Sequence, residues 1–140
     1  MLSVLRDWGH VSSPPKMARI VLADDHELIR RGLRSLIEAN KDWLICGEAG
    51  NGQEAVERVV ELKPDLVILD VTMPILNGLQ AARLIRERAP KTKILILSTH
   101  DSPQLANEAV RLGADAYLVK SGPQAQLLET IAGLVQRPMT

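Results

Sequence analysis

Three aspartates of this chain could meet at one edge of a β-sheet, because each follows an apolar run. Asp24 and Asp25 come directly after the run 18–23. Asp70 closes the segment 65–70, in which four consecutive residues are apolar. Open α/β sheets place their ligand sites at the carboxyl ends of the strands. Clustered carboxylates resist ionisation unless a cation offsets their repulsion. Mg²⁺ accepts one or two protein carboxylates together with waters and phosphate oxygens. The pattern therefore predicts a Mg²⁺ site with room for a phosphoryl group.

Two further strand candidates end in residues that suit a phosphoryl group. Ser98 ends the apolar run 93–98. Lys120 follows the run 115–119. A hydroxyl can donate to a phosphate oxygen, and an ammonium supplies a mobile positive charge. Taken singly, the serine and the aspartate pair are more often helix caps and the lysine a solvated strand end, but all of them at strand ends along one chain are typical of a phosphoryl-transfer site.

The elements that must position these residues alternate along the chain. Strand candidates lie at 18–23, 43–49, 65–70, 93–98 and 115–119. Apolar residues recur at helical spacing in the five segments between and after them. These residues are Leu28, Ile29, Leu33, Leu36 and Ile37; Ala55, Val56, Val59, Val60 and Leu62; Leu79, Ala82 and Ile85; Leu105, Ala106, Ala109 and Val110; and Leu127, Leu128, Ile131, Leu134 and Val135. Five strand–helix units with short connections predict an α/β fold, a doubly wound parallel sheet with helices on both faces.

Turn residues punctuate this pattern. Asn51 and Asn77, each followed by glycine, precede the second and third helical segments. Gly113 follows the fourth, where a helix C-cap is expected. These positions agree with the boundaries that the apolar spacing predicts.

The composition excludes several classes of protein. Seventeen basic residues balance seventeen acidic ones, so the chain as a whole lacks the charge that attracts nucleic acids or anionic membranes. The sequence has no apolar run long enough for a membrane span, no signal-peptide pattern and no glycine-rich nucleotide loop. The single cysteine, Cys46, lies in an apolar stretch, which favours a packed thiol and a cytoplasmic location.

The length of 140 residues corresponds to about one domain. Residues 1–16 show no sustained period and contain a Ser-Ser-Pro-Pro linker, so we expect the fold to begin at Met17. The predicted domain spans 17–137. Residues 1–16 are then a flexible leader or a remnant foreign to the fold, and 138–140 begin a linker or tail.

In its motifs the sequence resembles the receiver domain of two-component response regulators, over about Met17 to Arg137. The motifs are V-L-A-D-D-H at 21–26, P-D-L-V-I-L-D-V-T-M-P at 64–74 with N-G at 77–78, I-L-S at 96–98 and G-A-D-A-Y-L-V-K at 113–120. The first and last are most similar to the NarL/FixJ-like subgroup, whose receivers precede a LuxR-type helix-turn-helix domain. The resemblance implies a flavodoxin-like (β/α)5 fold with strand order 2-1-3-4-5.

The resemblance also implies the chemistry of the acidic cluster. Asp70 is then the phosphoacceptor that attacks a phosphohistidine on a sensor histidine kinase. Asp25, Asp70 and the backbone carbonyl of Thr72 bind Mg²⁺ directly, and Asp24 acts through water. Such a protein is a switch and not a conventional enzyme, because it catalyses only its own phosphotransfer and autodephosphorylation.

The remaining implied roles concern the response to phosphorylation. Lys120 pairs with the acyl phosphate, and Ser98 donates to a phosphate oxygen. Tyr117 is the aromatic switch that turns inward as Ser98 moves. We expect the change to spread over residues 102–136, a candidate homodimer surface.

DNA binding, and with it transcription control, would require an effector domain that this chain does not include. The chain stops at Thr140, where the linker of that subgroup would begin, so it is either truncated or a stand-alone receiver. Two departures from the family pattern are notable. Thr99 stands where the family usually carries a smaller residue, and Ser121 stands where it often carries proline.

Other functions fit the sequence less well. His26 and His100 could suggest Zn²⁺, but a carboxylate-rich cluster favours Mg²⁺. An aspartyl phosphatase on a related fold should carry Asp-x-Asp at its first strand, whereas here the aspartate pair is contiguous. A receiver that has lost phosphorylation should lack Asp25, Asp70 or Lys120, and all three are present. We therefore predict a phosphorylation-dependent switch.

Overall fold

The computed structural model describes residues 17–136. Our predictions of a leader over 1–16 and a tail over 138–140 fall outside the described residues, as does the last residue of the predicted domain. The elements are β1 (Ala18–Ala23), α2 (Glu27–Glu38), β2 (Trp43–Ala49), α3 (Gly52–Leu62), β3 (Leu66–Asp70), α4 (Gly78–Arg88), β4 (Lys93–Ser98), α5 (Pro103–Arg111), β5 (Ala116–Val119) and α6 (Gln124–Val135). In this part of the chain, none of the helices is both long and apolar enough to cross a membrane.

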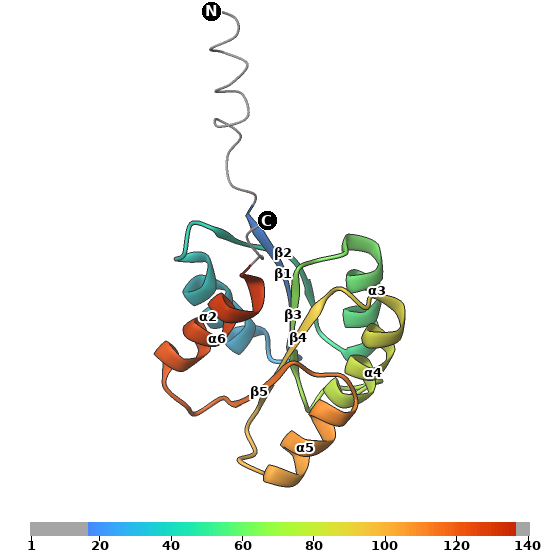
Figure 1. Cartoon of the computed structure of the whole chain (residues 1–140). Helices are drawn as coiled ribbons and strands as arrows, with labels where there is room; N and C mark the ends of the chain where they lie inside the picture. Colours follow the sequence, from blue (N-terminus) through green and yellow to red (C-terminus); the bar gives the residue numbers. More distant parts are fainter. Residues whose placement is uncertain (1–16, 137–140) are drawn as a thin grey trace, which may run out of the picture.

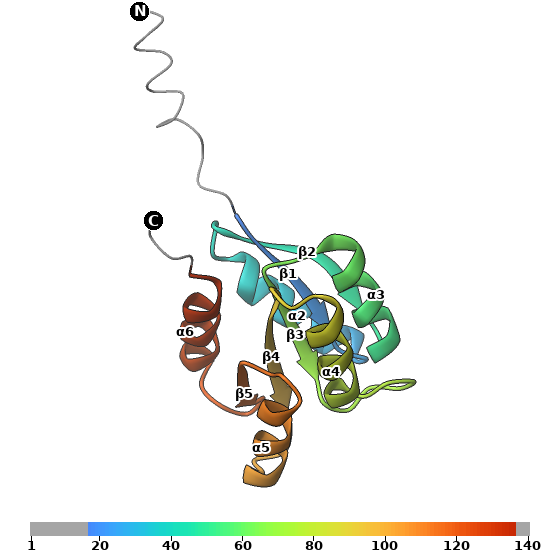
Figure 2. The ribbon, with the colours of Figure 1, turned by 45° about the vertical axis from the view of Figure 1, so that its right-hand side comes forward.

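The strands form one parallel sheet with the order β2-β1-β3-β4-β5. Helices α2 and α6 cover one face, and α3, α4 and α5 cover the other (Figure 1). The turned view in Figure 2 again separates α6 from α3 and α4 across the sheet. The predicted doubly wound fold and strand order are confirmed. In this order the central strand β3 ends between β1 and β4, with Ala23 level with Leu69 and Asp70 level with Leu97.

Side chains alternate along the strands and divide the apolar residues between two cores. In β1, Val21 and Ala23 pack under α3, α4 and α5, whereas Ile20 and Leu22 pack under α2 and α6. All of β3 is buried, and β4 is buried after its first residue. Burial on both faces explains why these strands appear in the sequence as continuous apolar runs.

The turn residues act as the sequence predicts. The side chain of Asn51 accepts from the backbone N–H of Glu54 at 2.8 Å and begins α3. Asn77 begins α4 through a capping box with Gln80, in which each side chain accepts from the other residue's backbone N–H. Gly113 follows α5 with φ of 115°, the left-handed conformation that glycine adopts readily.

Some residues of the predicted apolar faces do not enter the core. Leu28 at the start of α2 is 81% exposed, and Ile29, Val60 and Val110 are also exposed. The first turn of α2 carries few core contacts, and Ile37 is its one fully buried residue in the described chain. Periodicity therefore identified the helices correctly but did not determine how far along each helix the core extends.

Candidate functional site

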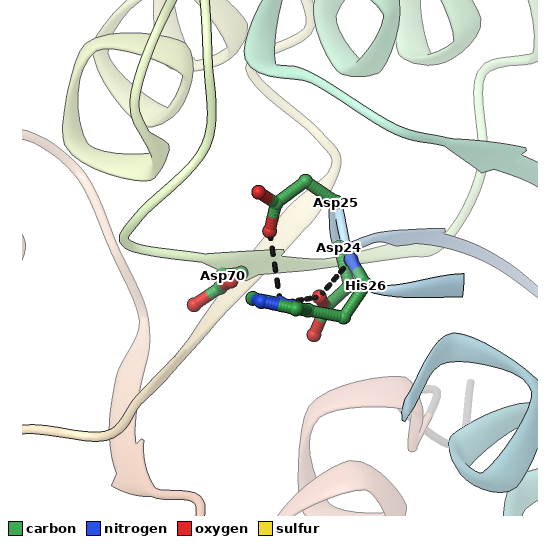
Figure 3. A group of neighbouring side chains, drawn as sticks. All are labelled: Asp24, Asp25, His26 and Asp70. Carbon is green, nitrogen blue, oxygen red and sulfur yellow. Dashed lines mark hydrogen bonds and ion pairs between the residues drawn. The ribbon is translucent and has the colours of Figure 1, made fainter. Parts of the chain in front are cut away.

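The loop after β1 holds two of the predicted site aspartates. Asp24 is 1% exposed, and its backbone N–H donates to the Ala49 carbonyl at 3.0 Å, which extends the pairing of β1 with β2 by one residue. Its Oδ1 accepts from the backbone N–H of His26 at 2.9 Å, so the carboxylate closes a tight turn and does not cap α2. The His26 ring lies between the carboxylates, with Nδ1 3.2 Å from Asp24 Oδ1 and 3.0 Å from Asp25 Oδ1 (Figure 3).

Asp70 ends β3 and is 4% exposed. Burial raises the pKa of its carboxyl group, and the neighbouring Asp24 carboxylate raises it further, whereas the Lys120 ammonium opposes both effects. The backbone N–H of Thr72 donates weakly to Asp70 Oδ1, at 3.4 Å. A carboxylate in this position is costly unless it is balanced by positive charge.

The backbone after Asp70 is held by a close approach to α4. The N–H of Gly78 donates to the Val71 carbonyl at 2.8 Å, and a Cβ at Gly78 would lie 2.1 Å from the Asp70 carbonyl oxygen. Only glycine fits this contact. Between these residues Ile75 has φ of 72°, and the Leu76 N–H donates to the Pro74 carbonyl at 2.8 Å, so the loop turns sharply with an exposed β-branched residue at its apex.

Lys120, which follows β5, reaches both buried aspartates. Its Nζ lies 2.7 Å from Asp24 Oδ2 and 3.3 Å from Asp70 Oδ2, and its side chain is 14% exposed. Its backbone N–H donates to the Ser98 carbonyl at 2.7 Å, which fixes the start of the side chain beside β4. Lys120 is therefore not a solvated strand end, and it supplies the charge that two buried carboxylates require.

Ser98 is fully buried at the end of β4. Its Oγ accepts from the His100 N–H at 2.9 Å. The Tyr117 hydroxyl donates to the carbonyl of the same His100 at 2.7 Å. Ser98 and Tyr117 thus hold the two polar groups of one backbone residue, and the Ser98 hydroxyl still has its hydrogen to donate.

The donor set fits a hard divalent cation. One ligand atom from each of Asp24, Asp25, His26 and Asp70 lies within 4.8 Å of the others. Three of these four groups are carboxylates, and Mg²⁺ prefers oxygen ligands of this kind. Zn²⁺ sites are instead rich in histidine nitrogen and cysteine sulfur. His26, which the sequence singled out only as a weak zinc candidate, joins the cluster, whereas His100 does not belong to it. The structure therefore brings together Asp24, Asp25, Asp70 and Lys120, while Ser98 ends the neighbouring strand β4 and Thr72 lies in the loop after β3.

One further residue, Arg30, contacts the acidic loop although no pattern in the sequence points to it. Its Nη1 donates to the backbone carbonyl of Asp24 at 2.6 Å. An arginine in the second turn of an amphipathic helix is usually a surface residue, and no spacing rule predicts a contact from such a position to a loop carbonyl.

Comparison with known proteins agrees with this geometry. The family model described as the response regulator receiver domain matches residues 20–132. Transcriptional regulatory protein YdfI of Bacillus subtilis is 38% identical over 120 residues, which cover 86% of this chain and 56% of that protein. The nitrate/nitrite response regulator protein NarL of Escherichia coli is 36% identical over 114 residues, covering 81% of this chain and 53% of NarL.

Solved structures show the same likeness. The signal receiver domain of the putative response regulator NarL from Mycobacterium tuberculosis superposes with a TM-score of 0.82 at 30% identity, covering 86% of this chain and 98% of that one. A LuxR-family two-component response regulator from Aurantimonas gives a TM-score of 0.82 at 36% identity, with 86% of each chain covered. The chain therefore belongs to the response regulator receiver domain family and is similar to the receivers of LuxR-family regulators. It spans about half the length of the curated relatives that it matches.

Proposed function

We propose that Asp70 accepts a phosphoryl group from a phosphohistidine of a sensor histidine kinase in a Mg²⁺-dependent reaction. The observation that carries this proposal is the burial of the Asp70 carboxylate at the end of β3, with Asp24 and the Lys120 ammonium beside it. The ammonium beside this carboxylate supplies positive charge for a phosphoryl group, and the neighbouring carboxylates can hold a metal ion that supplies more.

The transfer forms one bond and breaks one. A carboxylate oxygen of Asp70 attacks phosphorus in line, the phosphorus–nitrogen bond to the donor imidazole breaks, and the electron pair leaves with that nitrogen. Asp25, Asp70 and the Thr72 carbonyl, with Asp24 through a water, would hold Mg²⁺, whose charge offsets that of the phosphoryl oxygens. Lys120 then exchanges its contact with the Asp70 carboxylate for one with the acyl phosphate. The only other reaction that this switch would catalyse is its own dephosphorylation, in which water hydrolyses the acyl phosphate of Asp70.

The response of the protein follows from the shared contacts of His100. When the Ser98 hydroxyl donates to a phosphoryl oxygen, the loop after β4 is drawn toward Asp70 together with the His100 N–H. The His100 carbonyl then moves relative to the Tyr117 hydroxyl, which releases the Tyr117 ring to turn inward. A local charge event thus shifts a two-state surface formed by α5, β5 and α6.

We propose that this surface, residues 102–136, transmits the signal by forming a homodimer. Exposed Val110 on α5 supports an apolar contribution to such a contact. Two of the charges on this surface are already used within the chain, since Arg111 pairs with Glu108. In a longer protein of the LuxR type the dimer would control transcription in the cytoplasm through a DNA-binding domain, and the description of the relative YdfI as a transcriptional regulatory protein supports the control of transcription.

Phosphorylation by a small donor tests the central claim. With Mg²⁺ and acetyl phosphate, the intact mass of the chain should increase by one phosphoryl group, and Asp70→Asn should abolish the increase. Asp101→Asn is the matched control, because Asp101 is an exposed carboxylate in the loop after β4, at the same edge of the sheet as Asp70. A chain that stays unmodified with Mg²⁺ and a competent cognate kinase would contradict the proposal.

A further inference from the structure

The side chain of Arg30 connects the acidic loop to the edge strand of the sheet. Its Nη1 donates to the Asp24 carbonyl at 2.6 Å, and its Nε donates to Glu48 Oε1 at 2.9 Å. The Arg30 side chain is 20% exposed. Glu48, on β2, is held in turn by Arg34. The guanidinium group therefore has a defined place between α2, β2 and the loop.

The carbonyl that Arg30 contacts belongs to the peptide that joins Asp24 to Asp25. The sheet fixes the preceding peptide, because the Asp24 N–H donates to the Ala49 carbonyl at 3.0 Å. Pairing between β1 and β2 ends at Ala23 and Ala49, so the sheet does not fix the next peptide. A peptide group is planar, and holding its carbonyl sets the direction in which the following residue leaves the chain. Arg30 thereby holds the peptide from which Asp25 leaves the chain.

We propose that Arg30 is a positioning residue of the cation site, which holds the Asp24–Asp25 peptide so that the Asp25 carboxylate faces Asp70. This inference rests on the proposed function, in which Asp25 and Asp70 bind Mg²⁺. Groups that orient metal ligands from outside the ligand set contribute to affinity by reducing the reorganisation that binding requires. The planar fork of arginine can serve the Asp24 carbonyl and Glu48 together, which the single ammonium of lysine does less well.

Positioning and simple charge have opposite consequences for the affinity of the site. The positive charge of Arg30 near the aspartates repels a cation, so its removal would by itself tighten Mg²⁺ binding. Loss of the hydrogen bond to the Asp24 carbonyl instead leaves Asp25 free to point elsewhere and weakens binding. The sign of the change therefore separates the two roles.

The experiment measures Mg²⁺ affinity by isothermal titration calorimetry on the full chain in its unphosphorylated form. Calorimetry is preferable to tryptophan fluorescence, because Trp43 is the first residue of β2 and is level with Ala18 at the start of β1, whereas Asp24 follows the end of β1. We expect Arg30→Gln to weaken Mg²⁺ binding about tenfold. Arg30→Lys, which keeps the charge, should also weaken it, although less.

Arg31→Gln is the matched control, because Arg31 is the next residue of α2, is exposed and pairs with Glu27 at 3.2 Å. It removes the same charge without a contact to the acidic loop, and its Mg²⁺ affinity should stay within about twofold of the parent. Arg30→Lys provides a second route if Arg30→Gln folds poorly, because it keeps the positive charge and loses only the paired contacts of the guanidinium with the Asp24 carbonyl and Glu48, so weaker Mg²⁺ binding in this variant cannot come from charge. Unchanged or tighter binding in both Arg30→Gln and Arg30→Lys, or an equal effect of Arg31→Gln, would overturn the proposal.

The same variants separate this inference from the proposed function. The Mg²⁺ concentration that gives half-maximal phosphorylation by acetyl phosphate should rise about tenfold in Arg30→Gln, in parallel with the calorimetric change. If the parent binds Mg²⁺ and Arg30→Gln binds it more weakly, but neither is phosphorylated on Asp70 even by a kinase, the proposed function fails and the role of Arg30 stands. If both are phosphorylated with the same Mg²⁺ dependence, the role of Arg30 fails and the proposed function stands.

Discussion

Two loops flank Asp70, and they are built in opposite ways. The acidic loop after β1 is held by contacts to Ala49, Arg30 and Lys120, and its first aspartate is buried. The loop after β4 is exposed at Thr99, His100 and Asp101. Within the described chain, the hydrogen bonds from neighbouring strands to its His100 come from Ser98 and Tyr117.

The difference matches two physical requirements. A charged group is bound tightly by ligands that are already in place, so the acidic loop benefits from many fixed contacts. A segment that changes position needs few contacts, because each one must be broken when it moves. We infer that the acidic side of the site serves binding and the serine side serves the response.

The largest expected effect comes from removing the cation that the acidic side depends on. Lys120→Met leaves Asp24 and Asp70 buried without their ammonium partner, and the loss of one member of a buried ion pair typically costs about 3 kcal/mol of stability. Urea unfolding in chelator at neutral pH should show this loss, and Mg²⁺ should restore part of it. Lys93→Met, at an exposed cation that begins β4, is the control and should change stability by less than about 0.5 kcal/mol. Equal effects of the two substitutions would show that the acidic loop does not depend on Lys120.

A second prediction uses the raised pKa of Asp70. Because the folded protein keeps this proton to a higher pH than the unfolded chain, unfolding releases a proton between about pH 4 and the raised pKa, and stability falls as pH rises through that window. Asp70→Asn removes the penalty while Lys120 keeps its 2.7 Å contact with Asp24. The variant should be more stable than the parent at pH 7 in chelator, by about 1.4 kcal/mol for each unit of pKa difference, and equal to it near pH 4.

The pH dependence distinguishes this effect from a general change in packing. Urea unfolding of parent and variant at both pH values gives the difference directly. Asp101→Asn, at the exposed carboxylate of the serine side, should give no pH-dependent difference. A stability gain for Asp70→Asn that is the same at pH 4 and pH 7 would mean that charge burial is not its cause.

The comparison of the two loops also shows what the sequence could predict. Asp70, Ser98 and Lys120 were found from their positions at strand ends, because a parallel sheet brings the carboxyl ends of its strands to one edge whatever the details of packing. The boundaries of β3 and β4 were nearly correct for a related reason, since strands buried on both faces are continuously apolar. The receiver-domain family was predicted from the motifs that contain these residues, and the family match over residues 20–132 confirms it.

Contacts between a side chain and a backbone group were not predictable. Arg30 reaches the Asp24 carbonyl, and Tyr117 reaches the His100 carbonyl, through loop conformations that leave no periodic signal in the sequence. The exposure of Leu28 was missed for a different reason, because helical periodicity does not show where the core ends along a helix. The residues of the acidic cluster were thus predictable, and the resemblance also pointed to Tyr117, whereas the contacts that Tyr117 and Arg30 make with backbone carbonyls were not.

The smallest expected effect concerns the serine side. Tyr117→Phe removes the hydrogen bond to the His100 carbonyl, which should lower global stability by less than about 1 kcal/mol because the contact is exposed. The same loss should increase hydrogen exchange of the His100 amide about fivefold, since few other contacts hold this loop. Ser98→Ala removes the hydroxyl that accepts from the His100 amide. If Ser98 and Tyr117 hold the His100 backbone as one cooperative unit, the His100 amide of the double variant should exchange no faster than that of the faster single variant. Amide exchange measured by NMR on the parent, both single variants and the double variant completes the cycle. Effects that multiply in the double variant would show that Ser98 and Tyr117 act independently, and the proposed coupling through His100 would have to be abandoned.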